Sequence, residues 1–143
     1  MLDILHDLPI NASAVTVYQA ISTPAGLDQW WTKTSRGEPR MRAVYDLGFG
    51  PGYDWQASVT QCQPGLRFEL HLTRADADWT GSRVGFELSP KGSATDVRFY
   101  HRGWPVLNEH YRISCFCWAM YLRVLRRHLE HGESVPYEAR LDV

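Results

Sequence analysis

The sequence of 143 residues has only three cysteines, no long apolar run and almost no net charge. Cys62, Cys115 and Cys117 are an odd number, and residues 1–13 lack the basic flank and apolar run of an export signal. We therefore expect no disulfide framework. No stretch reaches the roughly 18 consecutive apolar residues that a membrane span needs. These absences predict a cytoplasmic protein that does not bind a membrane.

The charge balance also excludes a class of partner. Fifteen Lys and Arg residues stand against sixteen Asp and Glu residues, which leaves a formal net charge of −1. A protein that binds nucleic acid usually carries a strong excess of positive charge on one face. We therefore expect no nucleic-acid partner.

Motifs for metals, nucleophiles and phosphates are missing as well. Cys115 and Cys117 lie two residues apart on an expected helix, so they point about 200° apart and cannot bind one metal ion together. The sequence has no Cys-x-x-Cys, His-x-x-x-His or Gly-x-Ser-x-Gly pattern. Gly48, Gly50 and Gly52 precede no helix, so they indicate a hairpin turn and not a phosphate-binding loop. We expect neither a metal nor a cofactor.

Apolar and polar residues alternate with a period of two in most of the chain, which is typical of half-buried strands. The clearest case is Leu66 to Leu72. Strands are expected at 2–8, 41–47, 53–61, 66–72, 84–88 and 97–101.

Helical spacing appears in three places. A first helix begins at a cap, Asn11 or Ser13, and ends at Thr23-Pro24. Pro24 suits the first turn of a second short helix. A long helix is expected over 108–131, ending at Gly132. Because no helix separates the later strands, the order predicts an α+β domain of about six or seven antiparallel strands, spanning 1–143 as one domain.

The long helix is apolar on two sides. Its main stripe has to cover the sheet, and the opposite side includes Ile113, Cys117, Met120 and Val124. Either the early helices cover this second side or it forms a homodimer interface.

Several short motifs, in this order, are similar to a known family. They are Ile10–Ser13, Ser22–Pro24, Trp30-Trp31, Pro64–Phe68, Ala94–Val97, His101–Trp104 and the apolar run from Trp118 to Leu125. The chain resembles the helix-grip proteins of the START-like (SRPBCC) group, in the branch related to the activator of Hsp90 ATPase. Cys117-Trp118 stands where that family usually has Gly-Trp. The resemblance implies a curved sheet wrapped around the long C-terminal helix.

The resemblance also implies a cavity for apolar or aromatic small molecules between the sheet and the helix. Strand parity and helix position supply its expected walls. The expected ligand-binding residues are Trp30, Trp31, Trp55, Phe68, Phe86, Phe99, His101, Trp104, Trp118, Tyr121 and Leu122. The alternative is a filled core, because inward aromatics also close ordinary cores.

His101 is the most notable polar residue because it shares a strand face with Val97 and Phe99. It is either a hydrogen-bonded core histidine, or else a ligand anchor or a general base. The second role would suit a polyketide cyclase or aromatase-like enzyme that uses the same cavity. A third hypothesis, from the named branch, is an interaction protein that contacts a chaperone.

Overall fold

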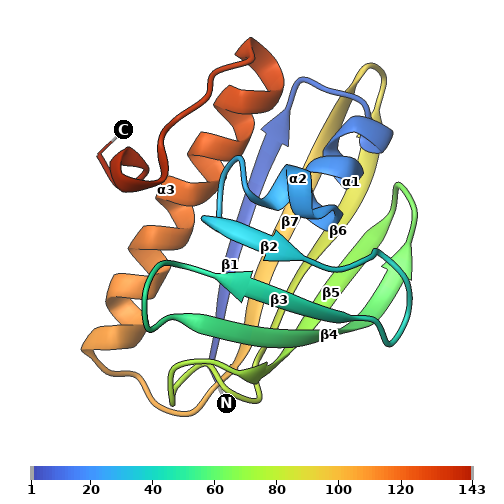
Figure 1. Cartoon of the computed structure of the whole chain (residues 1–143). Coiled ribbons are helices and arrows are strands. Elements are labelled where there is room, and N and C mark those ends of the chain that lie inside the picture. Colours follow the sequence, from blue (N-terminus) through green and yellow to red (C-terminus); the bar gives the residue numbers. More distant parts are fainter. Residues whose placement is uncertain (1, 143) are drawn as a thin grey trace.

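Seven antiparallel strands form one curved sheet with helices on one of its faces (Figure 1). The computed structural model describes residues 2–142. The strands are β1 (Leu2–Ile10), β2 (Thr34–Arg36), β3 (Val44–Gly48), β4 (Asp54–Gln63), β5 (Arg67–Arg74), β6 (Arg83–Lys91) and β7 (Ala94–Trp104). The helices are α1 (Ala14–Ser22), α2 (Pro24–Leu27), α3 (Glu109–His131) and the 3-10 turn η1 (Tyr137–Ala139).

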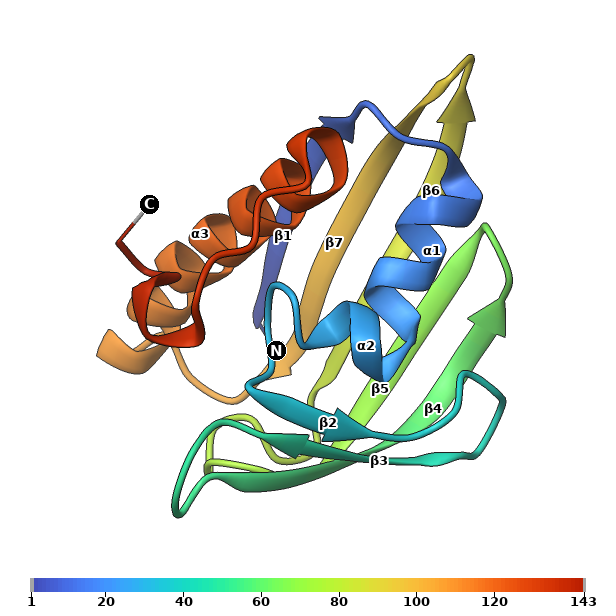
Figure 2. The ribbon, with the colours of Figure 1, turned by 45° about the horizontal axis from the view of Figure 1, so that its top comes forward.

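The order of strands across the sheet is β1-β7-β6-β5-β4-β3-β2. The first strand therefore pairs with the last, and the remaining strands follow as a meander. Figure 2 shows α3 beside β1 and the α1–α2 pair over β5 and β6, on the same side of the sheet. The predicted α+β helix-grip architecture is confirmed. The sequence missed β2, a three-residue edge strand, and the 3-10 turn η1.

Local signals mark the ends of the helices. The Ser13 hydroxyl, and not Asn11, caps α1 by accepting a hydrogen bond from the Thr16 amide at 3.2 Å. Pro24 occupies the first turn of α2. The Asn108 side chain caps α3 through the Tyr111 amide at 2.8 Å, and Gly132 ends it at φ 68°.

Inward positions of the strands form a closely packed aromatic core. Phe86 and Phe99 meet edge to face with their ring centroids 5.3 Å apart, and Trp118 of α3 packs on Phe99 at 4.5 Å. Phe68, from β5, is buried as well. The middle of the space between sheet and helices is therefore filled by side chains.

The outer face of the sheet holds a polar network that the sequence did not predict. Glu69 alternates with inward residues, yet only 7% of it is exposed. It accepts hydrogen bonds from Tyr100 at 2.5 Å and Thr60 at 2.6 Å, and pairs with Arg83 at 3.3 Å. Desolvation alone would raise the pKa of Glu69, but these partners outweigh it and lower the pKa below its usual range. Gly85 leaves room for the Tyr100 ring, which would lie 2.3 Å from a Cβ there.

The second apolar side of α3 is covered within the chain in one part and exposed in another. Val124 is fully buried, so the C-terminal part of this side is covered within the chain. Near the N-terminal end, Ile113 is 51% exposed, and its neighbour Phe116 is 65% exposed. An apolar surface therefore remains open at this end of the helix.

The segment after α3 returns along the helix toward β2 (Figure 1). Arg140, only 5% exposed, fixes it there by donating to the backbone carbonyls of Thr32 at 2.9 Å, Asp28 and Val135. The Tyr137 hydroxyl donates to the carbonyl of Phe49 at 3.1 Å. These contacts attach the tail to the segment after α2 through Arg140, and to the hairpin between β3 and β4 through Tyr137.

Candidate functional site

A pocket of about 280 Å³ opens at one end of the aromatic core. The β3–β4 hairpin, the loop between β5 and β6, the first half of α3, the segment after α2 and the C-terminal tail all contribute to it. Eight of its thirteen lining residues are aromatic. The lining consists of Trp31, Phe49, Tyr53, Trp55, Asp76, Trp79, His110, Ile113, Ser114, Cys117, Trp118, Tyr121 and Tyr137.

Five of these aromatic rings form a closed circuit in which each ring contacts the next. Trp31 lies 5.4 Å from Phe49, and Phe49 lies 4.7 Å from Trp55. Trp55 lies 5.0 Å from Trp79, which stacks on Trp118 at 5.6 Å. Trp118 closes the circuit on Trp31 at 5.3 Å. Since aromatic rings in mutual contact have few alternative positions, the circuit gives the pocket a rigid apolar wall.

The structure brings four of the eleven expected ligand-binding residues to this pocket: Trp31, Trp55, Trp118 and Tyr121. The other seven are buried elsewhere in the core and do not line it. They are Trp30, Phe68, Phe86, Phe99, His101, Trp104 and Leu122. Strand parity identified the inward face correctly but could not show which part of it is filled.

His101 is one of these seven, and both of its ring nitrogens are engaged. The Trp118 indole N–H donates to Nδ1 at 3.1 Å. The Ser82 hydroxyl donates to the carbonyl of Trp79, so it accepts from the Nε2–H of His101 at 2.7 Å. Burial, and to a smaller extent the nearby His110, lower the pKa of His101 to about 3. His101 is thus a neutral, hydrogen-bonded core histidine with no lone pair free to act as a base.

Sequence reasoning missed Phe49, Tyr53, Trp79, His110 and Tyr137. Trp79 offered the best signal, because it lies in an otherwise polar link between two strands and is nevertheless 8% exposed. A large aromatic in such a link generally packs against something. His110 and Tyr137 gave no signal, because their position depends on how α3 and the tail meet the loops.

The polar part of the pocket centres on His110 in the first turn of α3. Its Nδ1 lies 3.1 Å from Asp78 Oδ2, which also accepts from the Asn108 amide at 3.1 Å. These two hydrogen bonds, the one from Asn108 foremost, lower the pKa of Asp78. Asp76 is the other carboxylate near the opening, and no Lys or Arg is among the lining residues. Burial raises the pKa of the Cys117 thiol, which therefore stays protonated at neutral pH.

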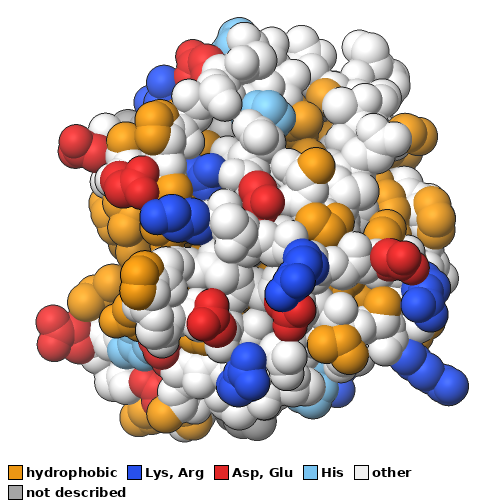
Figure 3. Space-filling model, in the orientation of Figure 1, with side chains coloured by type: hydrophobic (Ala, Val, Ile, Leu, Met, Phe, Trp, Pro, Cys, Tyr) orange, Lys and Arg blue, Asp and Glu red, His pale blue; other side chains and the backbone are white. Residues whose placement is uncertain are grey.

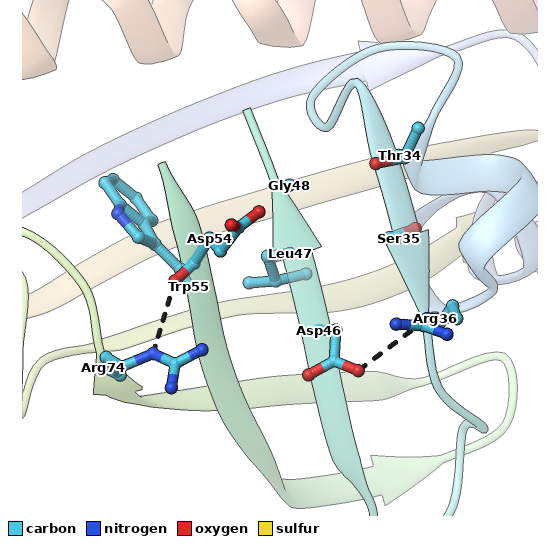
Figure 4. A pocket seen from close by; sticks show the side chains of 9 residues that line it. All are labelled: Thr34, Ser35, Arg36, Asp46, Leu47, Gly48, Asp54, Trp55 and Arg74. Carbon is cyan, nitrogen blue, oxygen red and sulfur yellow. Dashed lines mark hydrogen bonds and ion pairs between the residues drawn. The ribbon is translucent and has the colours of Figure 1, made fainter. Parts of the chain in front are cut away.

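A larger hollow of about 460 Å³ lies on β2, β3 and β4 (Figure 4). Its charged groups largely compensate one another. Arg36 approaches Asp46 at 3.9 Å, and the Arg74 side chain donates to the carbonyl of Asp54 at 3.3 Å. Trp55 belongs to the lining of both hollows. Because the lining of this outer hollow is more polar and its charged groups are already paired, the aromatic pocket is the better candidate site.

Side chains of both charges are interspersed over the face in Figure 3, in agreement with the net charge of −1. No helix among residues 2–142 is long and apolar enough to cross a membrane. In the same part of the chain, no group of His, Cys, Asp or Glu residues could hold a metal ion.

The fold and the site define a helix-grip domain with an aromatic pocket between the sheet and its long helix. The chain belongs to the family described as Activator of Hsp90 ATPase homolog 1-like protein, whose sequence profile matches residues 11–130. No curated protein matches the chain significantly.

Solved structures agree with this assignment. The Aha1 dimer from Colwellia psychrerythraea is 28% identical, with a TM-score of 0.84 over 94% of this chain and 100% of that one. CalU16 from Micromonospora echinospora is 18% identical, with a TM-score of 0.74 over 98% of this chain and 81% of that one. DynU16, from the dynemicin biosynthetic locus, is 19% identical, with a TM-score of 0.77 over 94% of this chain and 50% of that one. The last two share the fold.

Proposed function

We propose that this protein binds a small aromatic molecule in the pocket at the end of its core. The observation that carries the proposal is the closed circuit of Trp31, Phe49, Trp55, Trp79 and Trp118 around one side of an open space of about 280 Å³. An apolar cavity of roughly 150 Å³ already holds benzene. The available volume therefore suits a ligand of about two fused rings.

Binding would follow from ordinary packing forces. A flat ligand inside the pocket exchanges contact with water for contact with rings that are already held in place, so little side-chain entropy is lost. Each aromatic contact contributes roughly 0.5 to 1.5 kcal/mol beyond the buried area. The tail, fixed through Arg140 and Tyr137, holds one wall while the ligand enters.

Tryptophan indole resonances test this proposal directly. In a ¹H–¹⁵N NMR titration with naphthalene, we expect the indole signals of Trp31, Trp55 and Trp118 to shift together and to saturate. The indole of Trp30, buried outside the pocket, serves as the internal reference and should move least. No saturable change at the pocket indoles would refute the proposal.

A pair of variants tests whether naphthalene binds in this pocket. Cys117→Phe puts a ring into the pocket and should abolish naphthalene binding. Ala119→Phe adds the same ring at an exposed position of the same helix, outside the pocket, and should leave binding unchanged. Equal binding by both variants would place the ligand elsewhere.

We also propose that the chain forms a homodimer through the open apolar end of α3. The Aha1 relative from Colwellia is a dimer, and here Leu107 at 58%, Ile113 at 51% and Phe116 at 65% exposure form an uncovered apolar surface. Light scattering should show a dimer that Phe116→Glu dissociates. Val15→Glu, at an equally exposed position on α1, should not do so. A monomer at high micromolar concentration would contradict the proposal.

A second candidate function is contact with a chaperone ATPase, which the family assignment and the Aha1 relative favour. Purified protein mixed with a purified Hsp90 chaperone, followed by sedimentation and ATPase measurements, tests it. A complex with stimulated ATPase activity would support this function. If no complex forms and the ATPase activity does not rise, ligand binding is the only proposed function that remains.

A further inference from the structure

We propose that His110 is the polar anchor of the pocket and that the ligand is an aromatic molecule carrying a phenolic or enolic hydroxyl that donates to its Nε2. This inference rests on the proposed function and names its ligand class. Three observations support it: the hydrogen bond between His110 and Asp78, the charges of the residues at the pocket opening, and the contacts that fix the orientation of the His110 ring.

The partner of His110 fixes where its proton sits. Nδ1 lies 3.1 Å from Oδ2 of Asp78, and a carboxylate can only accept a hydrogen bond. Nδ1 therefore carries the hydrogen, and Nε2 of the neutral ring has a lone pair. Nε2 has no hydrogen-bond partner among residues 2–142, although the residue lines the pocket. The His110 side chain is 37% exposed, so the site offers an acceptor at which a ligand hydroxyl can replace water.

The charges at the opening favour the same kind of ligand. The lining contains one carboxylate, Asp76, and no Lys or Arg. An anionic ligand such as a carboxylate or phosphate would find no counter-charge there and would be repelled. A neutral hydroxyl meets no such penalty.

The His110 ring is held before any ligand arrives. Asn108 caps α3 through the Tyr111 amide and also donates to Asp78, so one residue fixes both the helix start and the carboxylate. On another side, Trp104 meets the His110 ring edge to face at 5.4 Å. Since the orientation of the His110 ring is already fixed, a hydrogen bond to Nε2 costs little further side-chain entropy. The arrangement places a fixed acceptor beside the rigid aromatic wall.

Three ligands with the same ring system separate the possibilities. Affinities of naphthalene, 2-naphthol and 2-naphthoate are measured at pH 8 for the unmodified protein, for His110→Phe and for His131→Phe. The last variant alters an exposed histidine at the far end of the same helix and is the matched control. His110→Phe keeps a ring against Trp104 but removes the acceptor. Asp78→Asn is a second variant, in case His110→Phe folds poorly.

One hydrogen bond contributes roughly 0.7 to 1.4 kcal/mol net, which corresponds to about three- to tenfold in affinity. We expect the ratio of 2-naphthol to naphthalene affinity to be about three- to tenfold larger in the unmodified protein and in His131→Phe than in His110→Phe. Naphthalene should bind all three equally, and 2-naphthoate should bind most weakly. The ¹⁵N resonance of His110 Nε2 should shift with 2-naphthol and not with naphthalene, which a purely structural histidine would not show.

The outcomes distinguish this inference from the proposed function. If naphthalene binds but the affinity ratio is the same with and without His110, or if 2-naphthoate binds most tightly, the inference is overturned and the proposed function stands. If none of the three ligands binds, both are overturned. A preference for 2-naphthol that disappears in His110→Phe supports both.

Discussion

Acid should destabilise this protein through one buried side chain, His101. The folded protein keeps His101 neutral, because its pKa is lowered to about 3 from an ordinary value of 6.5. The unfolded chain takes up a proton at the ordinary value. Between these two pH values the unfolded state binds more protons, so the free energy of unfolding falls as pH falls through this window. The loss is roughly 1.4 kcal/mol per pH unit, or about 2 to 3 kcal/mol between pH 7 and pH 4.5.

Urea unfolding of the native protein and of His101→Gln measures this loss. Glutamine can still accept from Trp118 and donate to Ser82, but it does not titrate. We expect the native protein to be the more stable at pH 7, and its advantage to shrink by about 2 to 3 kcal/mol at pH 4.5. His131→Gln, at an exposed position, should follow the native protein. Identical acid losses for the native protein and His101→Gln would refute the assignment of His101 as a buried neutral residue.

Three further substitutions probe contacts elsewhere in the fold, each by urea unfolding. Tyr100→Phe removes a hydrogen bond from buried Glu69 and should cost about 1 to 3 kcal/mol at pH 7; because it raises the folded-state pKa of Glu69 toward the unfolded value, the loss of stability below pH 5 should be shallower than in the native protein, and an unchanged pH dependence would count against the network. Gly85→Ala should cost about 1 to 3 kcal/mol because the new methyl would overlap the Tyr100 ring, and unchanged stability would show that the ring can move aside. Arg140→Met should release the C-terminal tail, seen as faster amide exchange after residue 133, and unaltered exchange would show that other contacts hold it.

Much of the fold could be predicted because its signals are local. Alternation from Leu66 to Leu72 identified β5, the choice of Asn11 or Ser13 as a cap placed the start of α1 within two residues, and Gly132 placed the end of α3. β2 was missed because three residues are too few for a pattern. Arg140 was missed because two of its partners, the backbone carbonyls of Thr32 and Asp28, lie more than a hundred positions away in the sequence, and composition gives no clue to them.

The site was only partly predictable. Parity showed that Phe99 and Trp55 point inward, but whether an inward ring fills the core or lines an opening depends on three-dimensional packing. Phe99 is covered by Trp118. Trp55 instead contacts Trp79 of the β5–β6 loop, and both residues line the pocket. His110 became visible as a site residue only when that loop brought Asp78 to the start of α3.

A crystal structure of the protein grown with 2-naphthol would show whether the pocket binds a hydroxylated aromatic molecule. We expect density for the two rings against the wall formed by Trp55, Trp79 and Trp118, with the hydroxyl oxygen within hydrogen-bond distance of His110 Nε2. An empty pocket at saturating ligand, or a ligand found instead in the outer hollow between Arg36 and Arg74, would contradict this expectation.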